Sequence, residues 1–102
     1  MGSARSGKGD IKLSDEFKIA ETESFQKNIH KEPIRSLYSK ITDYVYPQLR
    51  QNPFFGQNIK KLKGEFSSFY RYRIGNFRLF YSIDTAESLV IIVSLKDRKN
   101  AY

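Results

Sequence analysis

The sequence has no cysteine and only one histidine, His30. Without cysteine there is no disulfide framework, no thiolate nucleophile and no cysteine-based zinc site. One histidine excludes a metal site built from several imidazoles, and a serine–histidine–aspartate triad would depend on that single residue. No phosphate-binding glycine loop, metal-ligand spacing or pair of catalytic carboxylates is found either. We therefore expect neither a metal nor a cofactor.

Long apolar runs are also missing. No stretch reaches the roughly 20 residues that a membrane-spanning helix needs, and no segment has the layout of a signal peptide. We therefore expect a cytoplasmic protein that does not contact a membrane. The 102 residues suffice for one domain, and 39% hydrophobic with 28% charged residues is an ordinary globular composition.

Residues 1–17 differ from the rest because they are rich in glycine and show no apolar periodicity. We interpret this segment as a disordered leader or an expression remnant, with a short arm that docks on a partner as the alternative. Its charges cancel, so the whole net charge of +7 belongs to residues 18–102, the predicted single domain.

Positive charge is concentrated in residues 59–81, where six basic residues face Glu65 alone, giving a local net charge of +5. Aromatic residues are interleaved with these cations. Such a stretch is typical of proteins that bind nucleic acids or acidic proteins, although a solvated basic surface would look the same. The basic residues are Lys60, Lys61, Lys63, Arg71, Arg73 and Arg78.

Apolar periodicity predicts an α+β fold. A short strand is expected over 18–22, a helix over 24–30 and a second helix from Pro33, with Pro47 kinking or ending it. Tyr38, Tyr44 and Tyr46 should pack this helix on a sheet. Strands are expected over 66–74 and 77–84, joined by a turn at Gly75-Asn76, and over 89–95, a run apolar enough to be covered on both sides. Helices and strands in separate blocks favour an antiparallel sheet.

The predicted hairpin fixes a register in which Ile74 faces Phe77, Arg73 faces Arg78, Tyr72 faces Leu79 and Arg71 faces Phe80. Tyr72 and Leu79 then point to the core. The opposite face carries Arg71, Arg73, Arg78 and Phe80. Directly opposed arginines repel, and a bound phosphate would remove the conflict because it matches the guanidinium fork. Alternatively, Asp84, Glu65 or Glu87 neutralises the cluster, or the side chains spread into water.

Several segments together resemble the RelE/ParE superfamily of bacterial toxins from type II toxin–antitoxin systems. They are Lys61-Leu62-Lys63-Gly64, the run from Tyr70 to Tyr81, the apolar strand followed by Asp97-Arg98, and the closing Ala101-Tyr102. The resemblance covers residues 18–102. It implies a RelE-like microbial RNase toxin fold with two N-terminal helices packed on a twisted antiparallel β-sheet.

The resemblance implies one of two activities. RelE-like members are metal-independent endoribonucleases that cleave mRNA in the ribosomal A site, by attack of a ribose 2′-hydroxyl on the adjacent phosphate. ParE-like members block DNA gyrase without being enzymes. We expect the first, with the second as the alternative, and a degenerate member retained only as an antitoxin partner as a third reading. Every reading implies a cognate antitoxin, expected to be acidic and to fold on binding.

Family positions imply one set of site residues, and the basic rim around them supplies a second set, which suits a groove in ribosomal RNA. The expected catalytic residues are Arg71, Arg73, Arg78, Arg98 and Tyr102. The expected RNA-binding residues are Lys60, Lys61, Lys63, Phe80 and Lys96, with Phe80 or Tyr102 stacking on a base. The RelE-type pattern has lysines where this chain has Arg71 and Arg73, and arginine is a poor general base. Tyr102, Lys63 or Lys96 would then assist proton transfer, although the spacing from Arg98 to Tyr102 is short for the family.

Overall fold

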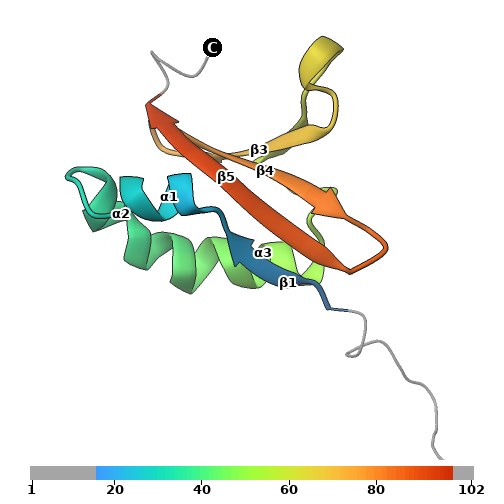
Figure 1. Ribbon diagram of the computed structural model, residues 1–102, viewed down its shortest axis with the longest axis horizontal. Coiled ribbons are helices and arrows are strands. Elements are labelled where there is room, and N and C mark those ends of the chain that lie inside the picture. The colour runs from blue at the N-terminus through green and yellow to red at the C-terminus, as the bar shows by residue number, and fades with distance from the viewer. Residues whose placement is uncertain (1–15, 98–102) are drawn as a thin grey trace, which may run out of the picture.

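The computed structural model describes residues 16–97, which form a sheet with helices on one side (Figure 1). In chain order the elements are strand β1 (Lys18–Glu21), helices α1 (Glu23–Asn28) and α2 (Ile34–Lys40), the π-helical turn η2 (Ile41–Val45), helix α3 (Tyr46–Gln51), strand β2 (Ile59–Lys61), the 3-10 turn η3 (Gly64–Phe66), and strands β3 (Phe69–Ile74), β4 (Phe77–Asp84) and β5 (Leu89–Asp97). No helix within this range is long and apolar enough to cross a membrane.

The sheet has five strands in the order β1-β5-β4-β3-β2. Neighbours from β2 to β5 are antiparallel, but β1 runs parallel to β5. The predicted antiparallel sheet is therefore wrong at this edge. The helices also follow the first strand instead of opening the fold. Parallel strands need a long crossover connection, and here the whole chain between residues 22 and 88 supplies it.

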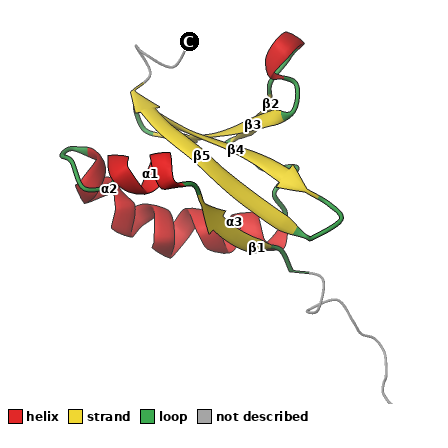
Figure 2. Ribbon diagram, viewed as in Figure 1, coloured by secondary structure: helices red, strands yellow, loops and turns green. Residues whose placement is uncertain are grey.

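The helices cover one face of the sheet, where the core lies (Figure 2). Side chains from the helices meet alternate residues of β3, β4 and β5, because successive strand residues point to opposite faces. In β5 the buried residues are Val90, Ile92 and Leu95, whereas Ile91 and Val93 are half-buried, so the expectation of a strand covered on both sides is wrong. The core cluster is Phe25, Ile41, Val45, Tyr46, Leu49, Tyr72, Ile74, Leu79, Tyr81, Val90, Ile92 and Leu95.

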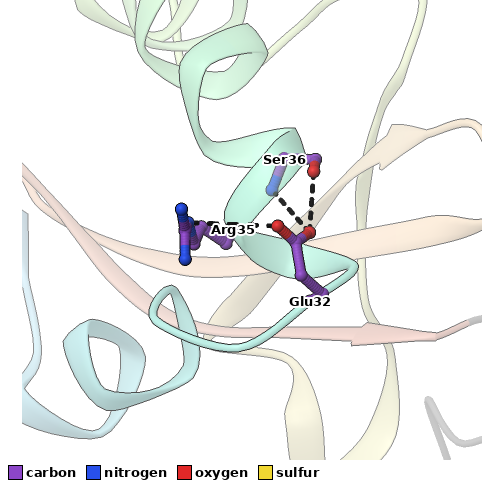
Figure 3. A network of polar contacts seen from close by, with 3 residues as sticks. All are labelled: Glu32, Arg35 and Ser36. Atoms are coloured by element: carbon purple, nitrogen blue, oxygen red, sulfur yellow. Dashed lines mark hydrogen bonds and ion pairs between the residues drawn. The ribbon is translucent and has the colours of Figure 1, made fainter.

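Side chains satisfy the first amide groups of α1 and α2. The Thr22 hydroxyl accepts a hydrogen bond from the Phe25 amide (3.1 Å) and donates one to the Val93 carbonyl (3.1 Å), which ties the start of α1 to β5. At α2, Glu32 accepts from the Ser36 amide (3.3 Å) and hydroxyl (2.7 Å), and its other oxygen lies 3.9 Å from Arg35 Nε (Figure 3). A carboxylate at this end also suits the helix dipole.

The second predicted helix continues past Pro47. Proline lacks an amide hydrogen and clashes with the carbonyl four residues earlier. The chain accommodates it by widening over η2, where the Tyr46 amide reaches back to the Ile41 carbonyl, and Pro47 then lies in the first turn of α3. Tyr38 and Tyr46 contribute to the core as expected, but Tyr44 is 65% exposed, so its predicted packing is wrong.

Phe17, which the sequence interpretation assigned to the leader, belongs to the packed domain. Its amide donates to the Arg50 carbonyl (2.8 Å), and its ring lies edge-on to Phe54 at 5.7 Å between centroids. Phe54 contacts Tyr70 in the same manner, and Tyr70 stacks on Tyr81 at 5.6 Å. This row of aromatic rings fixes the start of the fold to β3 and β4. The rest of the predicted leader, residues 1–15, lies outside the described residues.

Candidate active site on the open face of the sheet

The hairpin register predicted from the sequence is confirmed. Arg73 pairs with Arg78, Tyr72 with Leu79, and Arg71 with Phe80. Tyr72 and Leu79 are buried beneath the helices, at 4% and 0% exposure. Because strand residues alternate, Arg71, Arg73, Arg78 and Phe80 point to the face without the α-helices. Gly75, at the hairpin turn, has φ of +56°, a conformation that favours glycine.

Pairing with β5 and β2 extends the arginine cluster into two rows across the sheet. Arg78 pairs with Lys96, so Arg73, Arg78 and Lys96 form one row over three strands. The second row lies two residues away from the first on β3, β4 and β5, and β2 joins it. It consists of Lys60, Arg71, Phe80 and Ser94. Directly opposed side chains have Cβ atoms about 4.5–5.5 Å apart. Five of these seven positions carry a positive charge, and neither row contains an acidic residue.

Arg78 occupies the centre of the first row and has an unsatisfied donor. Its Nε is buried and has no hydrogen-bond partner among the described residues. An unpaired buried donor costs about 1–3 kcal/mol, more when the group is charged. An anion in front of the row would offset the repulsion between Arg73 and Arg78, and it would accept a hydrogen bond from Arg78 Nε once the side chain turned outward. The geometry therefore favours a site for a phosphate or carboxylate group at Arg78.

The other members of the cluster have different surroundings. Arg71 is half-buried, and its Nη1 donates to the Asn58 carbonyl (3.3 Å) just before β2. Arg73 is exposed. Phe80 is 8% exposed, so the idea that its ring stacks on a base is not supported; its position between Arg71 and Ser94 suits a packing role.

The acidic residues that could have neutralised the cluster lie elsewhere. Asp84 ends β4 and its Oδ1 accepts from the Glu87 amide (3.1 Å), within the turn that leads to β5. Glu65 is an exposed residue of η3. Arg73 and Arg78 have no ion-pair partner within residues 16–97. The charges of Arg73 and Arg78 are therefore not neutralised by any residue that the structure describes.

The remaining predicted residues are only partly placed. Lys60 and Lys61 belong to the edge strand β2 and are exposed, and Lys63 is exposed just beyond it. Only Lys60 joins the rows; Lys61 pairs with Tyr70 and so alternates to the other face. Arg98 and Tyr102 lie outside the described residues. Sequence reasoning did not place Lys60 beside Arg71, because β2 is three residues long and gives no periodic signal.

The family model of the "ParE toxin of type II toxin-antitoxin system, parDE" matches residues 11–102. No curated protein sequence matches the chain.

Solved structures resemble the fold. The chain is 25% identical to a chain of the toxin–antitoxin complex RelBE2 from Mycobacterium tuberculosis, with a TM-score of 0.69, and the match covers 81% of this chain and 99% of the other. The archaeal RelE–RelB complex from Pyrococcus horikoshii OT3 gives 22% identity, a TM-score of 0.66 and coverage of 83% and 98%. The YoeB/ParE toxin from Agrobacterium tumefaciens gives 19% identity and a TM-score of 0.63, and the match covers 79% of this chain and 98% of the other. The last two likenesses show the fold alone.

Proposed function

This chain belongs to the ParE toxin family of type II toxin–antitoxin systems, and we propose that its cationic rows form the active site of a ribosome-dependent mRNA endonuclease. The observation that carries this proposal is the row Arg73–Arg78–Lys96 with the unpaired Arg78 Nε at its centre. A phosphodiester in front of this row would offset the repulsion between its cations, and phosphate oxygens match the guanidinium fork.

The chemistry needs no co-reactant. The 2′-hydroxyl oxygen of one ribose attacks the phosphorus that links it to the next nucleotide, and the bond from phosphorus to the 5′ oxygen breaks. The hydroxyl proton passes to a base, and the leaving 5′ oxygen takes up a proton. The products are a 2′,3′-cyclic phosphate and a 5′-hydroxyl end. Arg73 and Arg78 stabilise the negative charge that develops on the phosphoryl oxygens.

Lys96 is the residue of this row to which we assign donation of the proton that the leaving 5′ oxygen takes up, because its ammonium group carries that proton. Arginine stays protonated at any accessible pH, so Arg71, Arg73 and Arg78 bind charge but do not donate a proton. Lysine releases its proton more readily, and Lys96 is directly opposite Arg78. Lys63 lies beyond β2 and outside both rows. Arg98 and Tyr102 stay predicted contributors to phosphate binding and base stacking.

A cognate antitoxin is the expected protein partner. The Mycobacterium tuberculosis and Pyrococcus horikoshii structures are complexes of a toxin with its antitoxin. For this chain, with a net charge of +7, we propose an acidic antitoxin that folds on binding and holds the toxin inactive. Action on the ribosome places the free toxin in the cytoplasm.

Brief induction of the toxin in a bacterium, followed by primer extension on an abundant mRNA, tests the proposal. We expect cuts within translated codons that vanish when translation initiation is blocked. Arg78→Ala should lower cleavage about 100- to 1,000-fold, as for loss of a donor that stabilises transition-state charge. Lys96→Arg keeps the charge but replaces the ammonium proton donor with a guanidinium that does not release its proton, so it should reduce cleavage while RNA binding is retained. The control is Arg35→Ala, an exposed arginine of α2.

A second candidate function is inhibition of DNA gyrase. The description of the matching family model, a ParE toxin, favours it, as do the arginines at positions 71 and 73. Growth arrest with intact mRNA, together with loss of DNA supercoiling activity, would overturn the endonuclease proposal and make the rows a binding surface. Equal cleavage by wild type and Arg78→Ala would also contradict it.

A further inference from the structure

A hollow of about 290 Å³ lies where the end of α2 and η2 approach the turn end of β3. Lys40 and Tyr44 line it from the helical side, and Asn58, Arg73 and Gly75 line it from the sheet. Arg73 also opens the first cationic row, and its amide donates to the Asn58 carbonyl (2.9 Å). Arg73 is therefore shared by the hollow and the first cationic row, whereas Tyr72 and Ile74, which also line the hollow, belong to the helix-covered face.

The exposure of Tyr44 at this hollow follows from the π-helical geometry of η2. It belongs to η2, whose neighbours Ile41 and Val45 are buried while Tyr44 is 65% exposed. A π-helical turn changes the direction in which side chains leave the helix, and such turns occur often at functional sites. The ring of Tyr44 thus adds little to the core and presents an aromatic surface beside the hollow.

The charges at the hollow are positive. Lys40 and Arg73 are both exposed and line it, and none of its lining residues is acidic. A cation pair attracts any anion, but an exposed aromatic ring adds recognition of a planar, aromatic group. Base stacking on aromatic side chains beside a positively charged groove is how proteins hold single-stranded nucleic acids. An acidic peptide would use the cations and leave the ring without a specific role.

We infer that this hollow binds one nucleotide of the RNA strand that flanks the cleaved phosphodiester. The base stacks on Tyr44, and the adjoining phosphate lies between Lys40 and Arg73. This inference rests on the proposed function, because it assigns a second position on the same RNA substrate. It makes Tyr44 and Lys40 binding residues that position the strand, without a part in the chemical step.

The absence of tryptophan from the chain provides a direct test. Tyr44→Trp introduces a single fluorescent indole at the hollow, and Phe55→Trp introduces one at a position that is 78% exposed and does not line it. Titration with a ten-nucleotide oligoribonucleotide should quench the fluorescence of Tyr44→Trp through stacking and leave that of Phe55→Trp unchanged. Equal quenching of both, or of neither, would overturn the inference.

Measurements of RNA affinity and of mRNA cleavage together test this inference separately from the proposed function. Tyr44→Ala should weaken binding of the oligoribonucleotide, measured by fluorescence anisotropy, about 5-fold or more, whereas Phe55→Ala should not. If mRNA is cleaved and Tyr44→Ala cleaves and binds like wild type, the hollow is no nucleotide site although the endonuclease stands. If no mRNA is cleaved but Tyr44→Ala still weakens RNA binding, the hollow stands and the cleavage proposal fails. Loss of antitoxin binding alone would assign the hollow to the protein partner and overturn the inference.

Discussion

Glu21 joins the first strand to the helical layer through one carboxylate oxygen. Its Oε2 accepts hydrogen bonds from the hydroxyls of Tyr38 and Tyr46, each at 2.7 Å. Tyr46 is 4% exposed, so its hydroxyl has little access to water. Burial first, and then the Glu21 carboxylate, raise the pKa of Tyr38 to about 12 and also raise the pKa of Tyr46. Both hydroxyls therefore keep their protons at neutral pH.

Removal of one hydroxyl should destabilise the domain moderately. Tyr46→Phe deletes a hydrogen bond to a charged group but leaves Glu21 with its bond to Tyr38, so no buried donor is left unpaired. We expect the free energy of unfolding to fall by about 1.5 kcal/mol, near the lower end for bonds to charged groups. Urea-induced unfolding at pH 7 measures this. The matched control is Tyr44→Phe, because the Tyr44 side chain is largely exposed; an equal loss there would contradict the role of Glu21.

Because the pKa of Tyr38 is raised, the stability that this contact contributes should be lost at alkaline pH. A tyrosine titrates near pH 10 in the unfolded chain and near pH 12 here, so between these values the unfolded chain binds fewer protons than the fold. The free energy of unfolding then decreases as pH rises through this range, and the contribution is complete only below pH 10. The decrease should be smaller in Tyr38→Phe than in wild type.

At the scale of elements, the β3–β4 hairpin depends on its turn. Gly75 has φ of +56°, and a Cβ added there would meet nothing within 4 Å, so any penalty for a side chain is conformational and not steric. We expect Gly75→Ala to lower the free energy of unfolding by about 1 kcal/mol and Gly75→Asn by less, since asparagine tolerates this conformation. Urea unfolding of the three proteins checks the order. Equal stability of Gly75→Ala and wild type would contradict it.

The same hairpin shows how far the sequence predicts the fold. Two adjacent alternating runs joined by Gly75-Asn76 leave one register that buries Tyr72 and Leu79, so the pairing of Arg73 with Arg78 followed from local chemistry. The parallel contact of β1 with β5 has no local signal, because it depends on the path of the chain between them. β2 is too short for a periodic pattern, and the accommodation of Pro47 by η2 required the packing of Ile41 and Val45.

The candidate site likewise has a part that the sequence predicts and a part that depends on contacts between elements. Alternation alone placed Arg71, Arg73 and Arg78 on one face. The alignment of Lys96 with Arg78 required the bulge in β5, where the pairing shifts between Phe80 and Tyr81. The burial of Phe80 and the exposure of Tyr44 depend on contacts across elements, so neither could be read from the sequence.

For the molecule as a whole, the family match confirms the resemblance to RelE/ParE toxins that the sequence predicted. The fold separates two surfaces. Helices cover the apolar face of the sheet, and the uncovered face carries the cationic rows, so a net charge of +7 is partly concentrated where no α-helix of the described chain intervenes. Such a charged face attracts a polyanion over distances greater than contact.

The concentration of charge predicts how RNA binding depends on salt. Each phosphate neutralised on a single strand contributes about −0.7 to the slope of log K against log salt concentration. Arg73 and Arg78 each face the proposed phosphate path, so Arg73→Ala or Arg78→Ala should reduce the steepness by about 0.7. Arg35→Ala should not, although it removes the same net charge, because Arg35 lies on α2 beside Glu32. Anisotropy titrations of an oligoribonucleotide from about 50 to 200 mM salt give the slopes. If all three variants lose the same amount, the binding follows net charge and not the rows, and the face has no defined phosphate path.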